Sequence, residues 1–319
     1  MKKYLITGFS GFVSQHFMNL LESIQEPVNI LGVDINEPEI DSQFRFVKYN
    51  FLKLNLLDKE AVYNMLSDFE PDYILHLASY SSVAYSWKYP VEAFANNSNI
   101  FLNLVDQVRL LKLKCRILSV GSSEEYGNIT EDQIPITELT TTKPNSPYAV
   151  ARVSQEMMSA IYANNYDVDI VMTRSFNHIG PGQKDIFVIS SFAKKLTDIK
   201  KGLVNSKSIV VGNIALIRDF VDVRDVVSAY YILLGKGKKG NVYNICSGKG
   251  YSLEEILKKM MAILELSLSI EIDKNLIRPD DNKIMIGSNE KLSKETGWNT
   301  TIDLDASLKN IIEYWTNKY

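Results

Sequence analysis

The chain has 319 residues, 45% of them hydrophobic and 23% charged, which is typical of a soluble globular protein and unlike a disordered one. At about 150 residues per domain, this length predicts two domains. The 35 lysine and arginine residues are balanced by 38 aspartate and glutamate residues. The chain therefore lacks the basic field of a nonspecific nucleic-acid binder, and we expect no nucleic-acid partner.

The cysteine content and the apolar runs predict where the protein works. Cys115 and Cys246 are the two cysteines, and both lie in apolar stretches, which suits a reducing compartment. Gly8 and Gly11 interrupt the first apolar run before it reaches the length of a signal-peptide core. Since no run approaches the roughly 20 residues that span a bilayer, we expect a cytoplasmic protein with no membrane partner.

Short apolar runs rich in β-branched or aromatic residues alternate with longer segments of helical spacing. The predicted strands are 3–7, 30–33, 45–47, 73–77, 116–120 and 169–173, and the predicted helices are 12–25, 59–69, 90–111 and 148–166. This alternation indicates βαβ units and a parallel sheet covered on both faces. The predicted fold class is α/β, a Rossmann-type doubly wound parallel sheet with a smaller α/β substrate domain.

The regular alternation ends near residue 173. Loops at 176–185 and 277–283 are interleaved with helical segments at 188–201, 223–234 and 252–266. We therefore predict a first domain over 1–173, with 216–240 packing back on it. The second domain would consist of 174–215 and 241–319.

A glycine-rich turn follows the first predicted strand. Gly8 and Gly11 lie where backbone amides and a helix N-terminus could approach a pyrophosphate, although a mere tight turn explains this motif equally well. Asp34 ends the second predicted strand, 20 residues after Ser14, close to the offset of about 20 at which a carboxylate binds the ribose of NAD. The combination predicts dinucleotide binding. NAD(H) is preferred over NADP(H), because a carboxylate would repel a 2′-phosphate.

Three nearby positions have competing interpretations. Ser14 stands where a third glycine is usual, and we expect a slight shift there. Asn55 could present its side chain to adenine, while Asp58 in the same segment suits a helix N-cap equally well. His76 lies inside an apolar strand, which favours a buried, hydrogen-bonded histidine over a ligand. No cluster of His, Cys, Asp and Glu indicates a metal.

A serine and a tyrosine form the candidate catalytic pair. Ser122 follows the fifth predicted strand, where open α/β sheets bind their ligands. Tyr148 precedes Arg152 by four residues on one helix face, and a nearby cation favours an ionised phenol. The pair suits proton exchange with an alcohol or ketone near neutral pH.

These motifs resemble the extended short-chain dehydrogenase/reductase family. Its marks here are the T-G-x-x-G opening, HLA at 76–78, Asn97, S-x-E-x-Y-G, and the Y-x-x-x-K pattern with arginine in its last place. Within that family the chain is most similar to bacterial GDP-4-keto-6-deoxy-D-mannose reductases, which make GDP-D-rhamnose. The selective stretches are GSSEEYG, RSFNHIGPGQKDIFVISSF, IRDFVDVRDVV, VYNICSG, and IGSNEKL followed by TGW.

The resemblance implies an NADH-dependent reduction of the C4 ketone of a GDP-linked 4-keto-6-deoxy sugar. Tyr148 would donate the proton, Ser122 would hydrogen-bond the ketone oxygen, and Arg152 would hold the nicotinamide ribose. Arginine is the main departure, because the family has lysine there and a planar guanidinium is no conservative substitute. Glu124 matches the base of the related 4,6-dehydratases, but close reductases share it.

The resemblance also implies the binding residues and the assembly. The implied cofactor set is Gly8, Phe9, Ser10, Gly11, Phe12, Val13, Asp34, Asn55, Leu56, Leu77, Ala78, Ser79, Asn97, Val120, Tyr148, Arg152, Phe176 and His178. The implied substrate set is Ser82, Ser122, Ser123, Glu124, Tyr148, Asn177, Val188, Arg218 and Arg278. The helices at 94–111 and 148–166 would form the four-helix interface of a homodimer.

Two alternatives stay open. A GDP-mannose 4,6-dehydratase or a sugar-nucleotide 4-epimerase would keep its NAD bound and return the hydride, with no net consumption of NADH. A catalytically silent sugar-nucleotide-binding protein, suggested only by Arg152, would bind without turnover.

Overall fold

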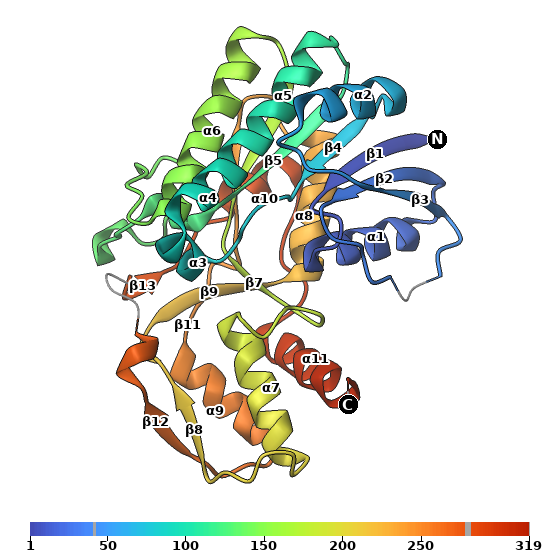
Figure 1. The fold of residues 1–319 in the computed structure, drawn as a ribbon. Coiled ribbons are helices and arrows are strands. Elements are labelled where there is room, and N and C mark those ends of the chain that lie inside the picture. The colour runs from blue at the N-terminus through green and yellow to red at the C-terminus, as the bar shows by residue number, and fades with distance from the viewer. Residues whose placement is uncertain (41–42, 278–281, 319) are drawn as a thin grey trace.

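The computed structural model describes residues 1–40, 43–277 and 282–318, and it has a larger and a smaller part (Figure 1). The larger part holds a seven-stranded sheet in the order β10-β6-β5-β4-β1-β2-β3, in which every pairing is parallel. Its strands are β1 (Lys2–Thr7), β2 (Val28–Asp34), β3 (Val47–Lys53), β4 (Tyr73–His76), β5 (Arg116–Ser122), β6 (Asp169–Ser175) and β10 (Val242–Ile245). The predicted α/β doubly wound class is confirmed.

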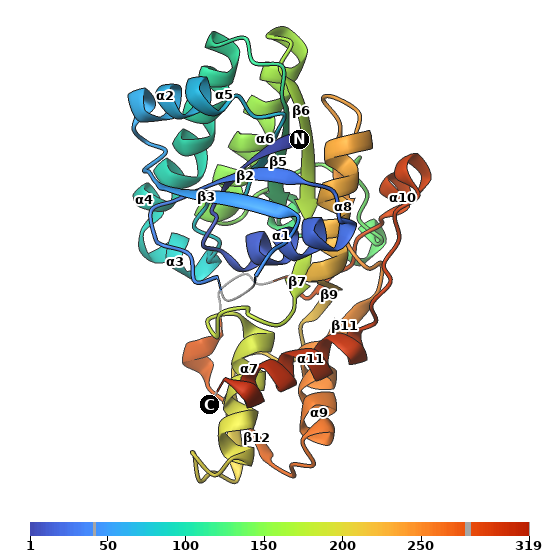
Figure 2. The ribbon, with the colours of Figure 1, turned by 90° about the vertical axis from the view of Figure 1, so that its right-hand side faces the viewer.

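Helices cover both faces of this sheet because successive strand residues point to opposite sides (Figures 1 and 2). Tyr4 and Ile6 belong to one buried core, together with apolar residues of α1 (Phe12–Ile24), α8 (Val223–Lys236) and α10 (Glu290–Thr296). Leu5, between them, belongs to the other core, with α2 (Lys59–Phe69), α5 (Ile100–Leu110) and α6 (Pro147–Asn165). The sheet is therefore buried on both sides.

The strand order reverses at β1. The chain builds outward through β2 and β3 on one side, and then crosses to β4 and β5 on the other. Ligands of open α/β sheets bind at the carboxyl ends of the strands beside such a switch point. The glycine turn after β1 and the loop after β4 therefore lie where a ligand is expected.

The smaller part lies beyond the carboxyl end of β6, since β6 leads directly into β7 (Figure 1). Its strands are β7 (Asn177–Ile179), β9 (Ile217–Asp222), β11 (Gly250–Ser252) and β13 (Ile284–Met285) in one sheet, and β8 (Ser208–Val211) and β12 (Ser269–Ile272) in another. The helices α7 (Val188–Lys200), α9 (Leu253–Ile263) and α11 (Leu304–Asn317) share one core with residues of β7, β8, β9, β11 and β12. The smaller part therefore lies on the side of the large sheet where β6 has its carboxyl end.

The strand pairings divide two segments between the parts in a way that chain order does not indicate. The segment 216–240 is shared between the two parts, because β9 pairs with β7, β11 and β13, whereas α8 and Val221 of β9 belong to the core of the large sheet. The strand β10, expected in the second domain, pairs with β6 at the edge of the large sheet. Both differences arise because strand pairing is decided by distant partners and not by chain order.

Two predicted elements differ from those observed. The strand expected at 45–47 begins at Val47 and runs to Lys53, and at its start Glu22 accepts the backbone N–H groups of Arg45, Phe46 and Val47 at 2.8, 2.9 and 2.9 Å. The continuous helix expected at 90–111 is divided into α4 (Pro90–Phe94), a π-helical turn (Ala95–Asn99) and α5. Such π turns are frequent at functional sites.

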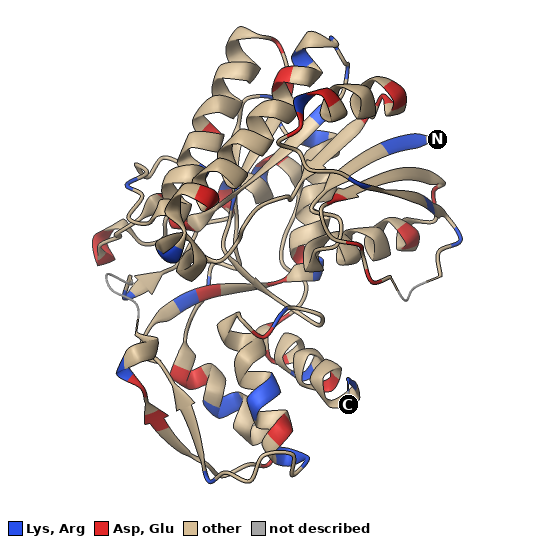
Figure 3. Cartoon of the chain, in the orientation of Figure 1, with Lys and Arg blue, Asp and Glu red and all other residues tan. Residues whose placement is uncertain are grey.

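Basic and acidic residues are interspersed over both parts (Figure 3). Cys115 and Cys246 are both buried and free. Among the described residues, no helix combines the length and apolar character needed to cross a membrane.

Candidate active site

The turn after β1 is a cradle of backbone at the switch point. Gly8 has a φ of 70°, and a Cβ there would lie 2.8 Å from the Ala78 nitrogen in the loop after β4. Only glycine combines this left-handed conformation with so close an approach. Gly11 precedes α1 and makes no side-chain cap, so N–H groups of the first helical turn can face an anion. The turn therefore fits the pyrophosphate of a dinucleotide.

Phe9 and Ser14 support this turn from within the protein. The ring of Phe9 is fully buried against Gly32, whose Cβ would meet it at 2.2 Å, and the Phe9 N–H donates to the Val33 carbonyl oxygen at 3.2 Å. The Ser14 hydroxyl donates to the carbonyl oxygens of Phe9 and Gly11, the latter at 2.8 Å. Serine thus occupies the third glycine position by bonding to the turn itself.

Asp34 connects the end of β2 to the glycine turn. Its Oδ2 accepts hydrogen bonds from the Ser10 N–H at 3.1 Å and the Ser10 hydroxyl at 2.6 Å. Its Oδ1 accepts from the Asn36 N–H at 3.0 Å. The carboxylate is half-buried at the mouth of the turn, where a ribose ring would follow the pyrophosphate.

The segment after β3 resolves one of the open interpretations. Asp58 caps α2, its Oδ1 accepting from the Ala61 N–H at 3.0 Å, so the N-cap interpretation is confirmed. Asn55 turns its Oδ1 back to the Leu57 N–H at 3.0 Å. Leu56 is buried in the core, and its carbonyl accepts from Asn103 at 2.9 Å.

The loop after β4 is held against the turn from two sides. The Leu77 N–H donates to the Thr7 carbonyl at 3.2 Å, and the Ala78 N–H donates to the Thr7 hydroxyl oxygen at 3.2 Å. Asn97, in the π turn, accepts from the Tyr80 N–H at 2.7 Å and donates to the Tyr80 carbonyl at 3.2 Å. Ser79 lies between these two anchors, so the loop presents a fixed backbone beside Gly8.

His76 is the buried core histidine that the sequence predicts. It has no exposed surface, and its Nδ1 lies 2.9 Å from the Thr7 hydroxyl oxygen. Burial, and then the nearby Arg152, lower the pKa of His76 to about 3, so its imidazole is neutral at functional pH.

Ser122 is prepared as a hydrogen-bond donor. It ends β5, and its hydroxyl oxygen accepts the Glu124 N–H at 3.2 Å, which leaves the hydroxyl hydrogen to donate to a ligand. The Ser122 N–H donates to the Glu125 carboxyl at 2.7 Å. Ser123 is buried in the short 3-10 turn (Ser123–Tyr126), and Glu124 is partly exposed there.

Tyr148 and Arg152 project from the first turns of α6. Ser146 caps this helix through the Ala149 N–H at 3.1 Å, and Pro147 opens it. The guanidinium carbon of Arg152 lies 5.2 Å from the centre of the Tyr148 ring. Arg152 Nη1 donates to the Val120 carbonyl at 3.2 Å, which ties the helix to the strand of Ser122. The predicted catalytic residues are thus carried by two elements that pack together.

The buried Nε of Arg152 has no hydrogen-bond partner within the protein. A buried guanidinium donor without an acceptor is unfavourable unless a ligand supplies one. Together with the cradle at Gly8, this atom shows that the residues present fit a dinucleotide whose nicotinamide ribose carries hydroxyl acceptors.

Three predicted substrate residues, and His178 of the predicted cofactor set, lie on β7, β9 and α7 of the smaller part. His178 on β7 stacks on Phe12, with ring centres 6.3 Å apart, and burial lowers the pKa of its imidazole. Arg218 on β9 is 9% exposed and donates to the Ile217 carbonyl at 2.9 Å. Asn177 begins β7, and the exposed Val188 begins α7.

Several predicted positions lie elsewhere or have structural roles. Phe176 is 1% exposed and belongs to a small core with Tyr126. Ser82 caps α3 (Val83–Lys88) through the Tyr85 N–H at 3.2 Å. Val13 is half-buried in the first turn of α1. Arg278 lies outside the described residues.

Comparison with known proteins decides the family. A family model described as GDP-mannose 4,6 dehydratase matches residues 5–311. The GDP-6-deoxy-D-mannose reductase of Pseudomonas aeruginosa is 31% identical over 317 residues, which cover 99% of this chain and 98% of that protein. The chain belongs to the GDP-mannose 4,6-dehydratase family. The predicted extended short-chain dehydrogenase/reductase type is confirmed.

Other members and solved structures agree with this assignment. The structure of RMD from Pseudomonas aeruginosa complexed with NADPH has a TM-score of 0.88 and 30% identity, and the match covers 100% of both chains. A GDP-6-deoxy-D-talose 4-dehydrogenase of Aggregatibacter actinomycetemcomitans is 28% identical over 303 residues, covering 92% of this chain and 91% of that protein. A UDP-glucose 4-epimerase of Thermotoga maritima, 24% identical with a TM-score of 0.87 over 99% of both chains, shares the fold.

Two groups of buried or half-buried polar residues near the candidate catalytic residues were not predicted from the sequence. Gln155 bonds to Arg152 at 2.7 Å, three residues along the same helix. Beneath the Ser122 turn, Arg174 binds Glu156 with two hydrogen bonds at 2.8 and 2.7 Å and lies 3.8 Å from Glu125. A polar residue on a helix usually faces solvent, so its spacing gives no sign of such burial.

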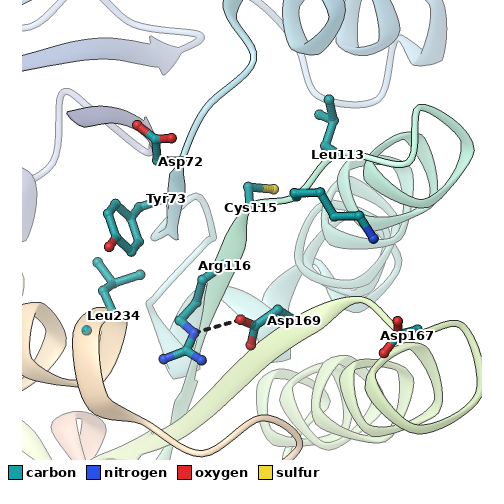
Figure 4. Close-up of a pocket in the computed structure, with 10 residues that line it drawn as sticks. Asp72, Tyr73, Leu113, Cys115, Arg116, Asp167, Asp169 and Leu234 are labelled. Carbon is teal, nitrogen blue, oxygen red and sulfur yellow. Dashed lines mark hydrogen bonds and ion pairs between the residues drawn. The ribbon is translucent and has the colours of Figure 1, made fainter. Parts of the chain in front are cut away.

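A cavity of about 490 Å³ lies at the amino-terminal ends of strands of the large sheet (Figure 4). It is bordered by the amino-terminal ends of β4, β5 and β6, at Tyr73, Arg116 and Asp169, and Arg116 pairs there with Asp169 at 3.0 Å. The cradle at Gly8 is at the carboxyl ends of the strands, so this cavity is separate from the candidate active site.

Among the described residues, no group of three or more His, Cys, Asp or Glu side chains could hold a metal ion.

Proposed function

We propose that this protein reduces the C4 ketone of a GDP-linked 4-keto-6-deoxy sugar, converting GDP-4-keto-6-deoxy-D-mannose to GDP-D-rhamnose. The observation that carries the proposal is that β5, which ends at Ser122, is tied by the Arg152–Val120 hydrogen bond to the helix α6 that carries the Tyr148 phenol and the Arg152 cation. The 31% identity to the GDP-6-deoxy-D-mannose reductase of Pseudomonas aeruginosa supports the choice of substrate.

The residues of the chain divide the chemistry of the ketone between them. When bound, NADH supplies the hydride that reaches C4. The Tyr148 phenol gives its proton to the ketone oxygen, and Ser122 donates a hydrogen bond to the same oxygen. The Arg152 guanidinium, 5.2 Å from the ring, stabilises the phenolate left on Tyr148. One ketone, one hydride and one proton thus give one alcohol.

Binding of the two nucleotides follows from the sites already described. Gly8, Gly11 and Asp34 would hold the dinucleotide, with Asn97 fixing the loop beside it. We assign NADH over NADPH because the half-buried Asp34 carboxylate would repel a 2′-phosphate. Asn177, Arg218 and Arg278 would hold the sugar nucleotide, since guanidinium groups pair with pyrophosphate oxygens.

Assembly and location complete the proposal. We propose a homodimer through α5 and α6, because Val150, Met157 and Ile161 form an exposed apolar stripe along α6. Two free, buried cysteines support a reducing, cytoplasmic setting.

The deciding experiment mixes the purified protein with NADH and freshly made GDP-4-keto-6-deoxy-D-mannose. We expect stoichiometric oxidation of NADH and GDP-D-rhamnose as the product by NMR. A Tyr148→Phe variant should bind NADH but oxidise it at least about 100-fold more slowly, because it lacks the proton donor. Conversion of GDP-mannose to a 4-keto sugar without net NADH consumption would instead establish a dehydratase.

A further inference from the structure

Arg152 is buried, and one terminal nitrogen of its guanidinium makes its hydrogen bonds to the protein. The residue is 5% exposed, and its Nη1 donates both to the Val120 carbonyl at 3.2 Å and to the Gln155 Oε1 at 2.7 Å. The buried Nε has no partner. The protein thus fixes Nη1 and leaves the Nε–H for a ligand.

Gln155 is itself fixed in one orientation. It is 1% exposed, and its Nε2 donates to the Ser119 hydroxyl at 2.9 Å and to the Val120 carbonyl at 3.2 Å. A flipped amide would turn Nε2 toward Nη1, donor against donor, and would lose these bonds. The hydrogen-bond pattern therefore admits a single amide orientation, with Oε1 toward Arg152.

A lysine and an arginine at position 152 would require different hydrogen-bond partners. A lysine ammonium is a compact charge with rotatable donors, so a backbone carbonyl is enough to hold it. A guanidinium is planar, and its charge and donors are correctly placed only when the plane is fixed. The second acceptor, Gln155, sets that plane beside the Tyr148 ring.

We propose that Gln155 is a positioning residue for Arg152, which fixes the guanidinium plane beside the Tyr148 ring and leaves its Nε–H for the dinucleotide. The catalytic consequence rests on the proposed reductase function. The effect of Gln155 on the affinity for the nicotinamide dinucleotide can be measured without any sugar substrate.

The test is a double-mutant cycle with Gln155→Met, Arg152→Lys and the combined variant. Methionine nearly matches glutamine in volume but lacks the strong acceptor and the donors. With Arg152 present, we expect Gln155→Met to lower kcat by about 10- to 100-fold and to weaken NADH binding, because a slightly misplaced group is poorly catalytic. In the Arg152→Lys background, the same change should alter either quantity less than about threefold, because an ammonium does not need the second acceptor.

Ser159→Ala is the matched control. Ser159 donates to the Ser119 hydroxyl oxygen at 2.9 Å and to the Gln155 carbonyl at 2.8 Å, in the same polar cluster. Its removal should leave kcat and NADH affinity within about twofold of the parent. The melting temperature of every variant is measured alongside, so that a loss of folding is recognised.

Equal losses from Gln155→Met in the arginine and lysine backgrounds would overturn the inference, because Gln155 would then only support the fold. A large gain in turnover from Arg152→Lys alone would also overturn it, since arginine would then be a defect that Gln155 does not correct. If no keto sugar is reduced at all, the reductase proposal fails, but the NADH-binding cycle still decides whether Gln155 positions Arg152.

Discussion

The proposed preference for NADH over NADPH depends on a single residue, Asp34. Its Oδ2 is bound by the N–H and the hydroxyl of Ser10, so the carboxylate cannot easily swing away from the ribose position. A 2′-phosphate would meet this charge at close range. Lys53 is the neighbour of Asp34 in the parallel register and is a candidate for the opposite preference.

We predict that Asp34→Asn shifts the enzyme toward NADPH. The amide removes the repulsion but keeps an oxygen for Ser10, so the ratio of kcat/KM for NADPH to that for NADH should rise by about 10- to 100-fold. Steady-state rates with both dinucleotides measure the ratio. Glu37→Gln, an exposed acid nearby, is the control and should leave the ratio unchanged. A parent enzyme that already uses NADPH as well as NADH would contradict the assignment and implicate Lys53.

Residue-level prediction from sequence was successful where local pattern determines the environment. His76 in an apolar strand and Asp58 before a helix were both predictable, because burial and capping follow from immediate neighbours. Gln155 was not, because its partners Ser119 and Val120 lie on a strand more than thirty positions away. The structural role of a buried polar side chain depends on such distant contacts.

At the scale of elements, the turn between β5 and α6 depends on a buried acid. Glu125 has no exposed surface, its Oε1 accepts the Ser122 N–H at 2.7 Å, and its Oε2 has no hydrogen-bond partner. Burial, and then repulsion by Glu156, raise the pKa of Glu125 well above its usual range. Burial thus favours the protonated form of Glu125, while Glu156 pairs with Arg174.

We predict that Glu125→Gln is nearly neutral at pH 7, because glutamine reproduces the uncharged acid and its acceptor oxygen. The free energy of unfolding should change by less than about 1 kcal/mol. Glu125→Ala should be less stable by about 1 to 3 kcal/mol, because it leaves the Ser122 N–H unpaired. Urea unfolding measures both. A Gln variant as unstable as the Ala variant would show that Glu125 is ionised in the native state.

Elements with strong periodicity were predicted within a few residues, and those without it were not. The helix expected at 59–69 is observed with these bounds. The edge strand β3 was placed too early, because one of its faces is exposed and its apolar alternation is therefore faint. The π turn at Ala95–Asn99 has helical composition and differs only in its hydrogen bonds, which spacing does not reveal.

At the scale of the whole molecule, the exposed stripe on α6 predicts the assembly. Met157 is 60% exposed and Ile161 is 43% exposed, one helical turn apart. We expect the parent protein to be a dimer by light scattering, and Met157→Asp with Ile161→Asp to be a monomer, because charges would be buried at the interface. Leu139→Asp, at a position 95% exposed, is the control and should stay dimeric. A monomeric parent protein at micromolar concentration would rule out the interface.

The large sheet could be predicted as a class, but not its full membership. Local runs predicted six parallel strands, yet the seventh, β10, joins the sheet from a segment that follows β9 of the other part. The smaller part was predicted as an α/β domain, but only its helices and loops were located, because its strands are two to six residues long. So short a strand is stabilised by its partners, and sequence alone does not name them.

The histidines predict how the whole molecule responds to acid. Burial is the first cause that lowers the pKa of all three, His16, His76 and His178, and that of His76 falls from 6.5 to about 3. The unfolded chain then binds a proton that the folded chain refuses, so the stability from a neutral His76 is complete above pH 6.5 and is lost as the pH falls toward 3. Glu125 and Asp219 act in the opposite sense, because their raised pKa values favour the folded state at low pH.

A His76→Asn variant separates these contributions, since it removes only the histidine. The stability advantage of the parent over the variant should shrink by about 1.4 kcal/mol for each pH unit below 6.5. Urea unfolding of both proteins between pH 7 and pH 5 measures this slope, and NMR of the three imidazoles follows their protonation directly. If the two stability curves run parallel, or if the His76 imidazole gains its proton near pH 6.5, the native protein solvates this ring and its burial beside Thr7 and Arg152 is not maintained in solution.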